Sequence, residues 1–302
     1  MFPLWYSKIY TDGISPEATF PRTRYRAVRA LLGSQDAGNS IIYHEPAATP
    51  VEDLLLAHET VYVESFLSGS LDKGSVRRIG LRPWTEAIVE RTLVLTNGTI
   101  SAMRHAVENG GFAGNLGGGT HHAYAAFGSG YCIFNDLAIS ALVARRDYGI
   151  SRILILDLDV HQGDGTAQIL ENDPDIRTVS FHCGTNFPFR KMTSDIDVEF
   201  APGTTDDEYL STLESFLQRD PPLFEPELIL FQAGVDGLDT DKLGQLSLSH
   251  EGLRRRNEMV FSLASGSGIP VVVTMGGGYS DPLTPSVEAH ADLFLQAARD
   301  GA

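Results

Sequence analysis

The chain is long and apolar enough to form a large buried core, and its charge argues against polyanionic partners. It has 302 residues, of which 42% are hydrophobic and 21% are charged, which suits one sizeable domain. With 39 Asp and Glu against 23 Lys and Arg, the formal net charge is −16, which argues against nonspecific binding to nucleic acid or to an anionic membrane. Cys132 and Cys183 are too few for a disulfide framework and fit a reducing compartment.

The amino terminus and the hydropathy pattern predict a cytoplasmic protein. The first residues lack the basic segment and the long apolar run of a signal peptide. No apolar segment reaches the roughly 18–20 residues that a membrane-spanning helix needs. No linker, low-complexity tract or internal repeat divides the chain, so we expect a single domain over residues 1–302. The oligomeric state has no signature in the sequence.

Strand-like and helical segments alternate along the chain. In chain order, the predicted elements are a strand at 40–43, helices at 50–68, 84–108 and 133–146, strands at 153–159 and 178–182, a helix at 205–218, a strand at 228–233, a helix at 249–265, a strand at 270–275 and a helix at 285–299. This order is typical of a three-layer α/β/α domain with a mainly parallel sheet. In such folds, ligands bind at the carboxyl ends of the strands.

The predicted strand at 153–159 runs directly into a cluster of polar side chains, Asp-Leu-Asp-Val-His-Gln-Gly-Asp-Gly at 157–165. Side chains alternate along a strand, so Asp157, Asp159 and His161 are expected on one side if the extended conformation continues to residue 161. Asp together with neutral His suits zinc or a similar first-row divalent ion. The structural alternative is that Asp164 caps a helix that extends to about Asn172.

Polar or glycine-rich segments also occur elsewhere. The strand at 228–233 is followed by Gly-Val-Asp at 234–236, and the strand at 270–275 by Gly-Gly-Gly-Tyr at 276–279. A third cluster, Gly-Gly-Gly-Thr-His-His at 117–122, places two histidines on a glycine-rich loop. Neither triglycine is a phosphate loop, because both lack the Gly-Lys-Ser/Thr ending. Taken singly, each segment is also compatible with a flexible turn or a structural histidine pair.

In their order, these motifs resemble the zinc-dependent histone deacetylase and acetylpolyamine amidohydrolase family, which shares its fold with arginase. The order is the His-His pair, Gly-Tyr-Cys-Ile-Phe-Asn-Asp at 130–136, Asp-x-Asp-x-His, Ala-Gly-x-Asp at 233–236, and Gly-Gly-Gly-Tyr. The resemblance covers nearly the whole chain, from Phe-Pro-Arg-Thr-Arg-Tyr at 20–25 onward. The phrase Ile-Gly-Leu-Arg-Pro-Trp at 79–84, and Gln162 where the larger classes have His, are most similar to the compact class IV type and its bacterial relatives.

The resemblance implies one catalytic zinc ion with an open coordination position. Asp159, His161 and Asp236 match its ligands, and Fe(II) or Co(II) suits the same set. The matching catalytic residues are His121 and His122, which exchange protons with water and the leaving amine, Asp157 and Asp164, which orient His121 and His122 respectively, and Tyr279, which donates to the oxyanion.

The resemblance also implies a narrow tunnel for an aliphatic, lysine-like stem. Tyr131 and Phe187 match its aromatic walls, Leu243 an apolar residue at its rim, and Gly130 a backbone acceptor for the substrate amide. Gly277, beside Tyr279, is also expected to contact substrate. Arg24 matches a residue of an internal product channel. Asp157, Ser180 and Phe181 match the surroundings of a monovalent cation, which would be potassium.

The expected activity is therefore zinc-dependent removal of acetyl or longer acyl groups from lysine side chains of a peptide or protein. Acylated polyamines are the alternative substrates, but no long insertion narrows the mouth between Gly69 and Trp84, which favours lysine. An arginase-type enzyme with two manganese ions would need an acid two residues after Asp236, where Leu238 stands. A catalytically inactive acyl-lysine binding module, or a scaffold, would not need the complete set of residues.

Overall fold

Eight parallel strands form one sheet in the computed structural model, which describes residues 1–15, 17–81 and 84–301. Across the sheet the order is β2-β1-β3-β8-β7-β4-β5-β6. In chain order the strands are β1 (Phe2–Trp5), β2 (Ile41–His44), β3 (Phe112–Asn115), β4 (Ile153–Asp157), β5 (Ile176–Cys183), β6 (Ile196–Phe200), β7 (Leu228–Gln232) and β8 (Val271–Thr274). Because all strands run in one direction, their carboxyl ends meet at a single edge of the sheet.

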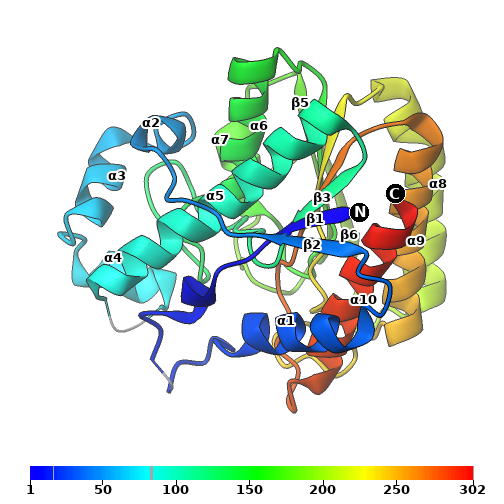
Figure 1. The fold of residues 1–302 in the computed structure, drawn as a ribbon, viewed down its shortest axis with the longest axis horizontal. Coiled ribbons are helices and arrows are strands. Elements are labelled where there is room, and N and C mark those ends of the chain that lie inside the picture. The colour runs from blue at the N-terminus through cyan, green and yellow to red at the C-terminus, as the bar shows by residue number, and fades with distance from the viewer. Residues whose placement is uncertain (16, 82–83, 302) are drawn as a thin grey trace.

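Helices cover both faces of this sheet. On one face α1, α10, α9 and α8 pack in succession, on the other α5 packs against α6 and α6 against α7, and α2, α3 and α4 gather at one end (Figure 1). The helices are η1 (Lys8–Thr11, a 3-10 helix), α1 (Arg24–Gln35), α2 (Val51–Leu54), α3 (Thr60–Leu67), α4 (Lys73–Ile79), α5 (Glu86–Asn109), α6 (Asp136–Tyr148), α7 (Asp164–Leu170), α8 (Asp206–Phe224), α9 (His250–Ser267) and α10 (Thr284–Asp300). The three-layer α/β/α architecture is therefore confirmed.

The central strands are apolar because both faces of the sheet are covered. Strands β4, β7 and β8 read Ile-Leu-Ile-Leu-Asp, Leu-Ile-Leu-Phe-Gln and Val-Val-Val-Thr, and every residue in them is buried. Continuous β-branched and Leu runs of this kind are typical of strands buried on both faces. Each of these strands ends in a buried polar residue, Asp157, Gln232 or Thr274. The change from apolar to polar marks the edge where the core gives way to a site.

The sequence predicted the central strands and long helices, but it missed several elements. Strands β1 and β3 have only four residues each and contain Pro3 and Gly114 respectively, which are residue types that strands disfavour. Strand β6 alternates as Ile-Asp-Val-Glu-Phe, a period-two signal that was available in the sequence. The helices α1 and α4 were also missed. Among the described residues, no helix is both long and apolar enough to cross a membrane.

Two helix predictions were wrong in extent. The single helix expected at 50–68 is divided into α2 and α3, and the segment between them contains the buried His58. The helix expected at 205–218 is longer, because α8 continues through Pro221 to Phe224 and ends where the Glu225 N–H donates to the Pro221 carbonyl. Asp164 is the first residue of α7, whose N-cap is Gly163, so Asp164 is not the cap.

Candidate active site

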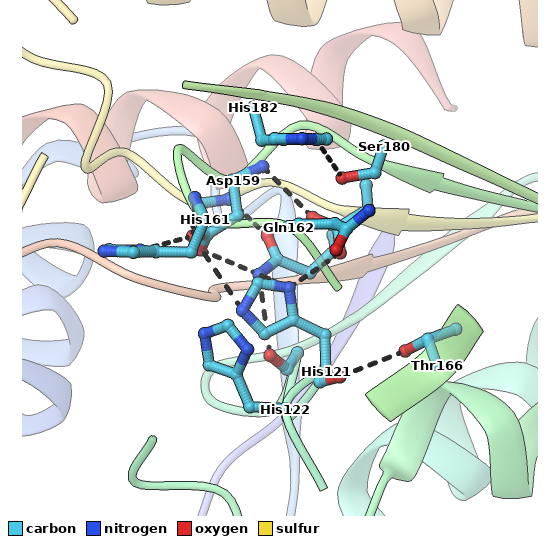
Figure 2. Close-up of polar contacts among 12 residues, drawn as sticks. His121, His122, Asp159, His161, Gln162, Thr166, Ser180 and His182 are labelled. Atoms are coloured by element: carbon cyan, nitrogen blue, oxygen red, sulfur yellow. Dashed lines mark hydrogen bonds and ion pairs between the residues drawn. The ribbon is translucent and has the colours of Figure 1, made fainter. Parts of the chain in front are cut away.

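Four adjacent strands deliver the polar motifs to one place. The order β3-β8-β7-β4 brings together the segments that follow these strands, which carry the histidine pair, Gly276–Tyr279, Asp236 and residues 157–164. A cavity of about 520 Å³ lies there, lined by His121, His122, Asp159, His161 and Tyr279 among others. Figure 2 shows His121, His122, Asp159 and His161 gathered at this point.

The chain turns sharply after β4, so the condition for Asp157, Asp159 and His161 to share one side, an extended conformation to residue 161, is not met. The strand ends at Asp157, whose Oδ1 accepts a hydrogen bond from the Asp159 N–H at 3.2 Å. Asp159 Oδ1 in turn accepts from the His161 N–H at 3.0 Å. These short-range bonds favour a turn over a strand. As a result Asp157 hydrogen-bonds to His121, while Asp159 and His161 lie beside Asp236.

Asp159, His161 and Asp236 form a compact, buried set of metal-binding side chains. One ligand atom from each lies within 4.8 Å of the others, and no second group of three such residues meets this criterion in the described part of the chain. His161 Nδ1 is 3.0 Å from Asp159 Oδ1 and 3.1 Å from Asp236 Oδ2. Two carboxylates and one imidazole fit zinc or a related divalent ion, with positions left for water and substrate.

The electrostatics of this set also fit a cation. Burial and the neighbouring Asp159 carboxylate raise the pKa of Asp236, since two close, buried carboxylates repel each other. A divalent cation would relieve this repulsion. Behind the strand ends the buried Arg256 donates from Nη1 to the carbonyls of Gly234 at 2.6 Å and Leu158 at 3.2 Å, which adds fixed positive charge near the carboxylates.

Asp236 and Asp159 each use the second carboxylate oxygen to connect strand-end loops. Asp236 Oδ1 accepts from the Val160 N–H at 3.0 Å, which joins the loop after β7 to the loop after β4. Asp159 Oδ2 accepts from the Gly277 N–H at 2.8 Å, which adds the loop after β8, and from Gln232 Nε2 at 2.8 Å. Sequence reasoning gave Gln232 no role, although a polar residue that ends an apolar strand was a signal for one.

The adjacent histidines each pair with their own carboxylate. His121 Nδ1 is 2.6 Å from Asp157 Oδ2, and His122 Nδ1 is 2.6 Å from Asp164 Oδ1. An N–H at Nδ1 that donates to a carboxylate leaves Nε2 as the proton-exchanging atom of each ring. Burial disfavours the charged form of His121, but Asp157 and Asp159 outweigh it and raise the pKa of His121 to about 9. Burial, and then the His121 charge, lower the pKa of His122 to about 4.

Asp136 holds the loop that carries the histidines. Its carboxylate accepts from the Gly119 N–H at 3.0 Å, from the Thr120 N–H at 2.7 Å and from the Thr120 hydroxyl at 2.6 Å. Asp136 opens α6, and the preceding Asn135 caps this helix by accepting from the Ala138 N–H. The sequence motif at 130–136 contained Asp136 without assigning it a function. Its several contacts with the two residues directly before the histidines could not be read from spacing alone.

Tyr279 lies at the other side of the cavity on the glycine loop. Its ring centroid is 6.0 Å from that of Tyr131, and the Arg24 guanidinium carbon is 5.5 Å from it. Burial raises the pKa of Tyr279 well above its ordinary value, so the side chain remains a neutral phenol that can donate a hydrogen bond. Arg24 is itself buried, lines the cavity, and donates to the carbonyls of Gly276 and Gly278 at 2.8 and 2.9 Å.

The residues expected to contact substrate also line this cavity. They are Gly130, Tyr131, Phe187, Leu243 and Gly277. The Phe187 ring meets the edge of His122 at a centroid distance of 4.8 Å, and Leu243 is 43% exposed at the rim. Gly277 has a steric reason to be glycine, because a Cβ there would lie 1.8 Å from Asp236 Oδ2.

The residues matched to a monovalent cation lie behind the histidine pair. Asp157 pairs with Ser180 in the β4–β5 register. Ser180 Oγ is 3.0 Å from His182 Nδ1 (Figure 2), and the side chain of Phe181 packs in the core against Phe200 and Phe216. Phe181 could therefore offer a cation only its backbone carbonyl.

Of the two sequence features that resemble class IV, only Gln162 lies entirely within the described residues. Arg82 and Pro83, in the phrase at 79–84, lie outside the described residues. Gln162 is buried and donates from Nε2 to the Met192 carbonyl and to Asp197 Oδ1, both at 2.8 Å. Gln162 therefore holds the segment that follows Phe187 and does not face the cavity.

Comparison with known proteins agrees with this architecture. A histone deacetylase domain model matches residues 18–294. The chain is 40% identical over 299 residues to an uncharacterized protein of Picosynechococcus, with 99% of both chains covered. It is 34% identical over 297 residues to histone deacetylase 2 of Arabidopsis thaliana, covering 96% of this chain and 76% of that protein. With a probable deacetylase of Archaeoglobus fulgidus it shares 29% identity over 283 residues, covering 87% and 77% of the two chains.

The parallel sheet and its surrounding helices are consistent with the arginase/deacetylase fold. Within that fold, the chain belongs to the histone deacetylase family. Membership of this family supports hydrolytic deacetylase activity, without specifying the substrate.

His58 generates a prediction about pH and stability. Its Nδ1 donates to the Tyr124 carbonyl at 3.0 Å and its Nε2 accepts from the Asn135 N–H at 2.9 Å, so the neutral ring bridges the two ends of the segment that follows the histidine pair. Burial lowers the pKa of His58 from 6.5 to about 4. The unfolded chain therefore binds a proton between these pH values that the folded protein does not.

We expect the contribution of neutral His58 to the free energy of unfolding to be complete above pH 6.5. It should be lost progressively as the pH falls toward 4. The loss should amount to roughly 3 kcal/mol, at about 1.4 kcal/mol per pKa unit. Chemical denaturation at a series of pH values should show a shallower pH dependence for His58→Gln than for wild type. His250→Gln, at a partly exposed position on α9 away from this segment, serves as the control and should retain the wild-type slope. Equal slopes for His58→Gln and wild type would refute this assignment.

Proposed function

We propose that this chain is a zinc-dependent deacylase that removes acetyl or longer acyl groups from lysine side chains. The observation that carries the proposal is that one cavity is lined by Asp159 and His161, by the His121 and His122 pair, and by Tyr279. The family membership supports hydrolysis of an acyl amide. The geometry supports a separate role for each of these groups.

Asp159, His161 and Asp236 would hold the ion. Bound there, a divalent cation would acidify water and polarise the acyl carbonyl. Asp236 contributes an additional oxygen that keeps the Val160 backbone in place, and Asp159 does the same for Gly277. The ligands are thus fixed before substrate arrives, which favours catalysis because little reorganisation is needed.

The paired histidines would move the protons. Asp157 and Asp164 hold the two rings with Nδ1 protonated, so that Nε2 of His122, or of the pair, takes a proton from the attacking water. The pair then returns a proton to the leaving lysine amine. The opposite pKa shifts of His121 and His122 support this division, because one ring favours the charged form and the other the neutral form.

Tyr279 would donate a hydrogen bond from its hydroxyl to the carbonyl oxygen as negative charge develops there. Its raised pKa keeps the phenol protonated, and a donor preorganised in a site shielded from water is typically worth ~2.7–4 kcal/mol in the barrier. The aromatic rings of Tyr131 and Phe187 would enclose the aliphatic stem and exclude water from the reacting atoms.

The lining of the cavity favours an acyl-lysine over an acylated polyamine. Among the described lining residues, Asp159 is the sole carboxylate, and it belongs to the metal-binding set. The lining residues Phe187, Phe189 and Leu243 are apolar, and Arg78 is cationic. An acylated polyamine carries further ammonium groups along its stem, which would need carboxylate partners. A lysine stem carries none.

Two finer assignments accompany the proposal. The resemblance to class IV is supported by Gln162, and a potassium ion near Asp157, Ser180 and the Phe181 carbonyl would suit the hard oxygen donors there.

An arginase-type pair of manganese ions is disfavoured because the chain has Leu238 where a further acid would be needed. An inactive acyl-lysine binding module stays as the alternative that a turnover assay excludes or establishes.

Replacement of Tyr279 or Asp159 tests the mechanism. We expect Tyr279→Phe to lower kcat for an acyl-lysine peptide by about 10²–10³-fold, because one oxyanion donor is lost. Asp159→Asn should abolish measurable turnover, because the metal-binding set loses a charged ligand. Tyr148→Phe, which removes a hydroxyl at a part-exposed position bonded to Glu108, is the matched control and should keep wild-type activity. Unchanged turnover in both Tyr279→Phe and Asp159→Asn would rule the mechanism out.

A substrate panel tests the proposed class. Peptides with acetyl- to myristoyl-lysine and a set of acetylated polyamines should be assayed against the zinc-loaded protein. We expect kcat/KM for at least one acyl-lysine peptide to exceed that for every polyamine by more than about tenfold, because unpaired ammonium groups are costly to desolvate. A preference for an acetylated polyamine would overturn the lysine assignment while leaving the hydrolytic mechanism intact.

A further inference from the structure

We propose that Asp241 is the positioning residue of Tyr279, and that it joins the oxyanion donor to the rim of the substrate tunnel. This inference rests on the proposed function and goes beyond it, because Asp241 contacts neither the ligand set nor the reacting atoms. The sequence gave no signal for it beyond an Asp two residues before Leu243.

The Asp241 carboxylate accepts hydrogen bonds from two separate loops. Oδ2 accepts from the Tyr279 N–H at 2.5 Å. Oδ1 accepts from the Leu243 N–H at 2.8 Å and from the Gly244 N–H at 2.9 Å. The Asp241 N–H itself donates to the Leu238 carbonyl at 3.0 Å, which fixes Asp241 to the loop that begins at the ligand Asp236. Charged acceptors make such bonds stronger than neutral ones.

Each residue of the Tyr279 loop, Gly276 to Tyr279, has a backbone group held by a distant side chain. Arg24 donates to the carbonyls of Gly276 and Gly278, and Asp159 accepts from the Gly277 N–H. At Tyr279 itself the backbone N–H is the group that is held, and Asp241 holds it. The three glycines supply no side-chain packing, so these polar contacts determine where the loop lies.

The phenol depends on this backbone anchor. In the described part of the chain, no hydrogen bond holds the Tyr279 hydroxyl, and the ring is placed by its distant aromatic and guanidinium neighbours, Tyr131 and Arg24. A catalytic donor that is displaced by about 1 Å can lose about 10²-fold in rate. The position of the Tyr279 N–H therefore sets the position of the donor.

The same carboxylate places the tunnel rim. Leu243 is held by Asp241 through its N–H and by Asn186 Nδ2 through its carbonyl, at 2.5 Å. Asn186 adjoins the tunnel-wall residue Phe187. A shift of the Asp241 side chain would thus move the rim and the oxyanion donor together, which gives Asp241 a role that a purely local turn residue would lack.

Asp241→Asn tests the inference with a nearly isosteric change. The amide retains one oxygen for the Leu243 and Gly244 N–H groups, but its NH₂ group cannot accept from the Tyr279 N–H. For an acyl-lysine peptide we expect kcat to fall about 10–100-fold with KM changed less than about threefold, because the contact matters mainly in the transition state. In a Tyr279→Phe background the same substitution should change kcat less than about threefold, because the donor that it positions is already gone.

Lys242→Gln is the matched control. It removes the exposed ion pair between Lys242 and Asp281, which joins the same two loops without touching the Tyr279 N–H. It should change kcat less than about twofold, since exposed ion pairs contribute little. Equal losses from Asp241→Asn in the wild-type and Tyr279→Phe backgrounds, or no loss in either, would overturn the inference.

Amide hydrogen exchange separates this inference from the proposed function. In the zinc-loaded protein, exchange of the Tyr279 amide should accelerate at least about tenfold in Asp241→Asn and stay unchanged in Lys242→Gln, since exchange reports loss of the protecting bond. This readout holds even if wild type hydrolyses none of the acyl substrates, a result that would refute the function alone. An unchanged Tyr279 exchange rate would refute the positioning role.

If Asp241→Asn does not fold, an ester in place of the Gly278–Tyr279 peptide bond removes the same N–H and leaves Asp241 and the phenol unaltered. Its kcat should fall about 10–100-fold if the N–H anchor positions the donor. Wild-type kcat in this ester variant would contradict the inference.

Discussion

The site depends on buried carboxylates that accept hydrogen bonds from the backbone of neighbouring strand-end loops. Asp236 holds Val160 after β4, Asp159 holds Gly277 after β8, and Asp136 holds Gly119 and Thr120 after β3. A buried carboxylate is costly unless its oxygens are paired, so each of these loops has one arrangement that satisfies both partners. The parallel sheet brings the loops to one edge, and the carboxylates fix them there.

This arrangement explains how a densely acidic site can be stable and reactive at once. Asp157, Asp164 and Asp236 each have one carboxylate oxygen bonded to a neighbouring backbone N–H or hydroxyl and the other facing a histidine. Arg256 and Arg24 add positive charge behind the strand ends through bonds to backbone carbonyls. The fold therefore supplies the rigid, preorganised environment that acyl-amide hydrolysis requires, and membership of the histone deacetylase family agrees with it.

Apolar runs that end in polar residues predicted the layer architecture, and the resemblance to the deacetylase family predicted the residues that meet at the cavity. The same resemblance divided those residues between the ligand set and its supports, whereas the strand pattern alone placed Asp157, Asp159 and His161 on one side. The turn at Asp157 depends on side-chain bonds that override the strand pattern. Gln232, Asp136 and Asp241 act on segments distant in the sequence, as Asp241 does on Tyr279. Pairings of this kind arise from strand order, which periodicity does not encode.

Anomalous diffraction at the zinc edge, from crystals of the zinc-loaded protein, tests the central claim most directly. The account predicts one strong peak per chain within about 2.0–2.2 Å of one ligand atom each of Asp159, His161 and Asp236. It also predicts that the side chains move little from the arrangement described, because their remaining polar atoms are already bonded. Two peaks bridged by carboxylates, or a single peak away from these three residues, would contradict it.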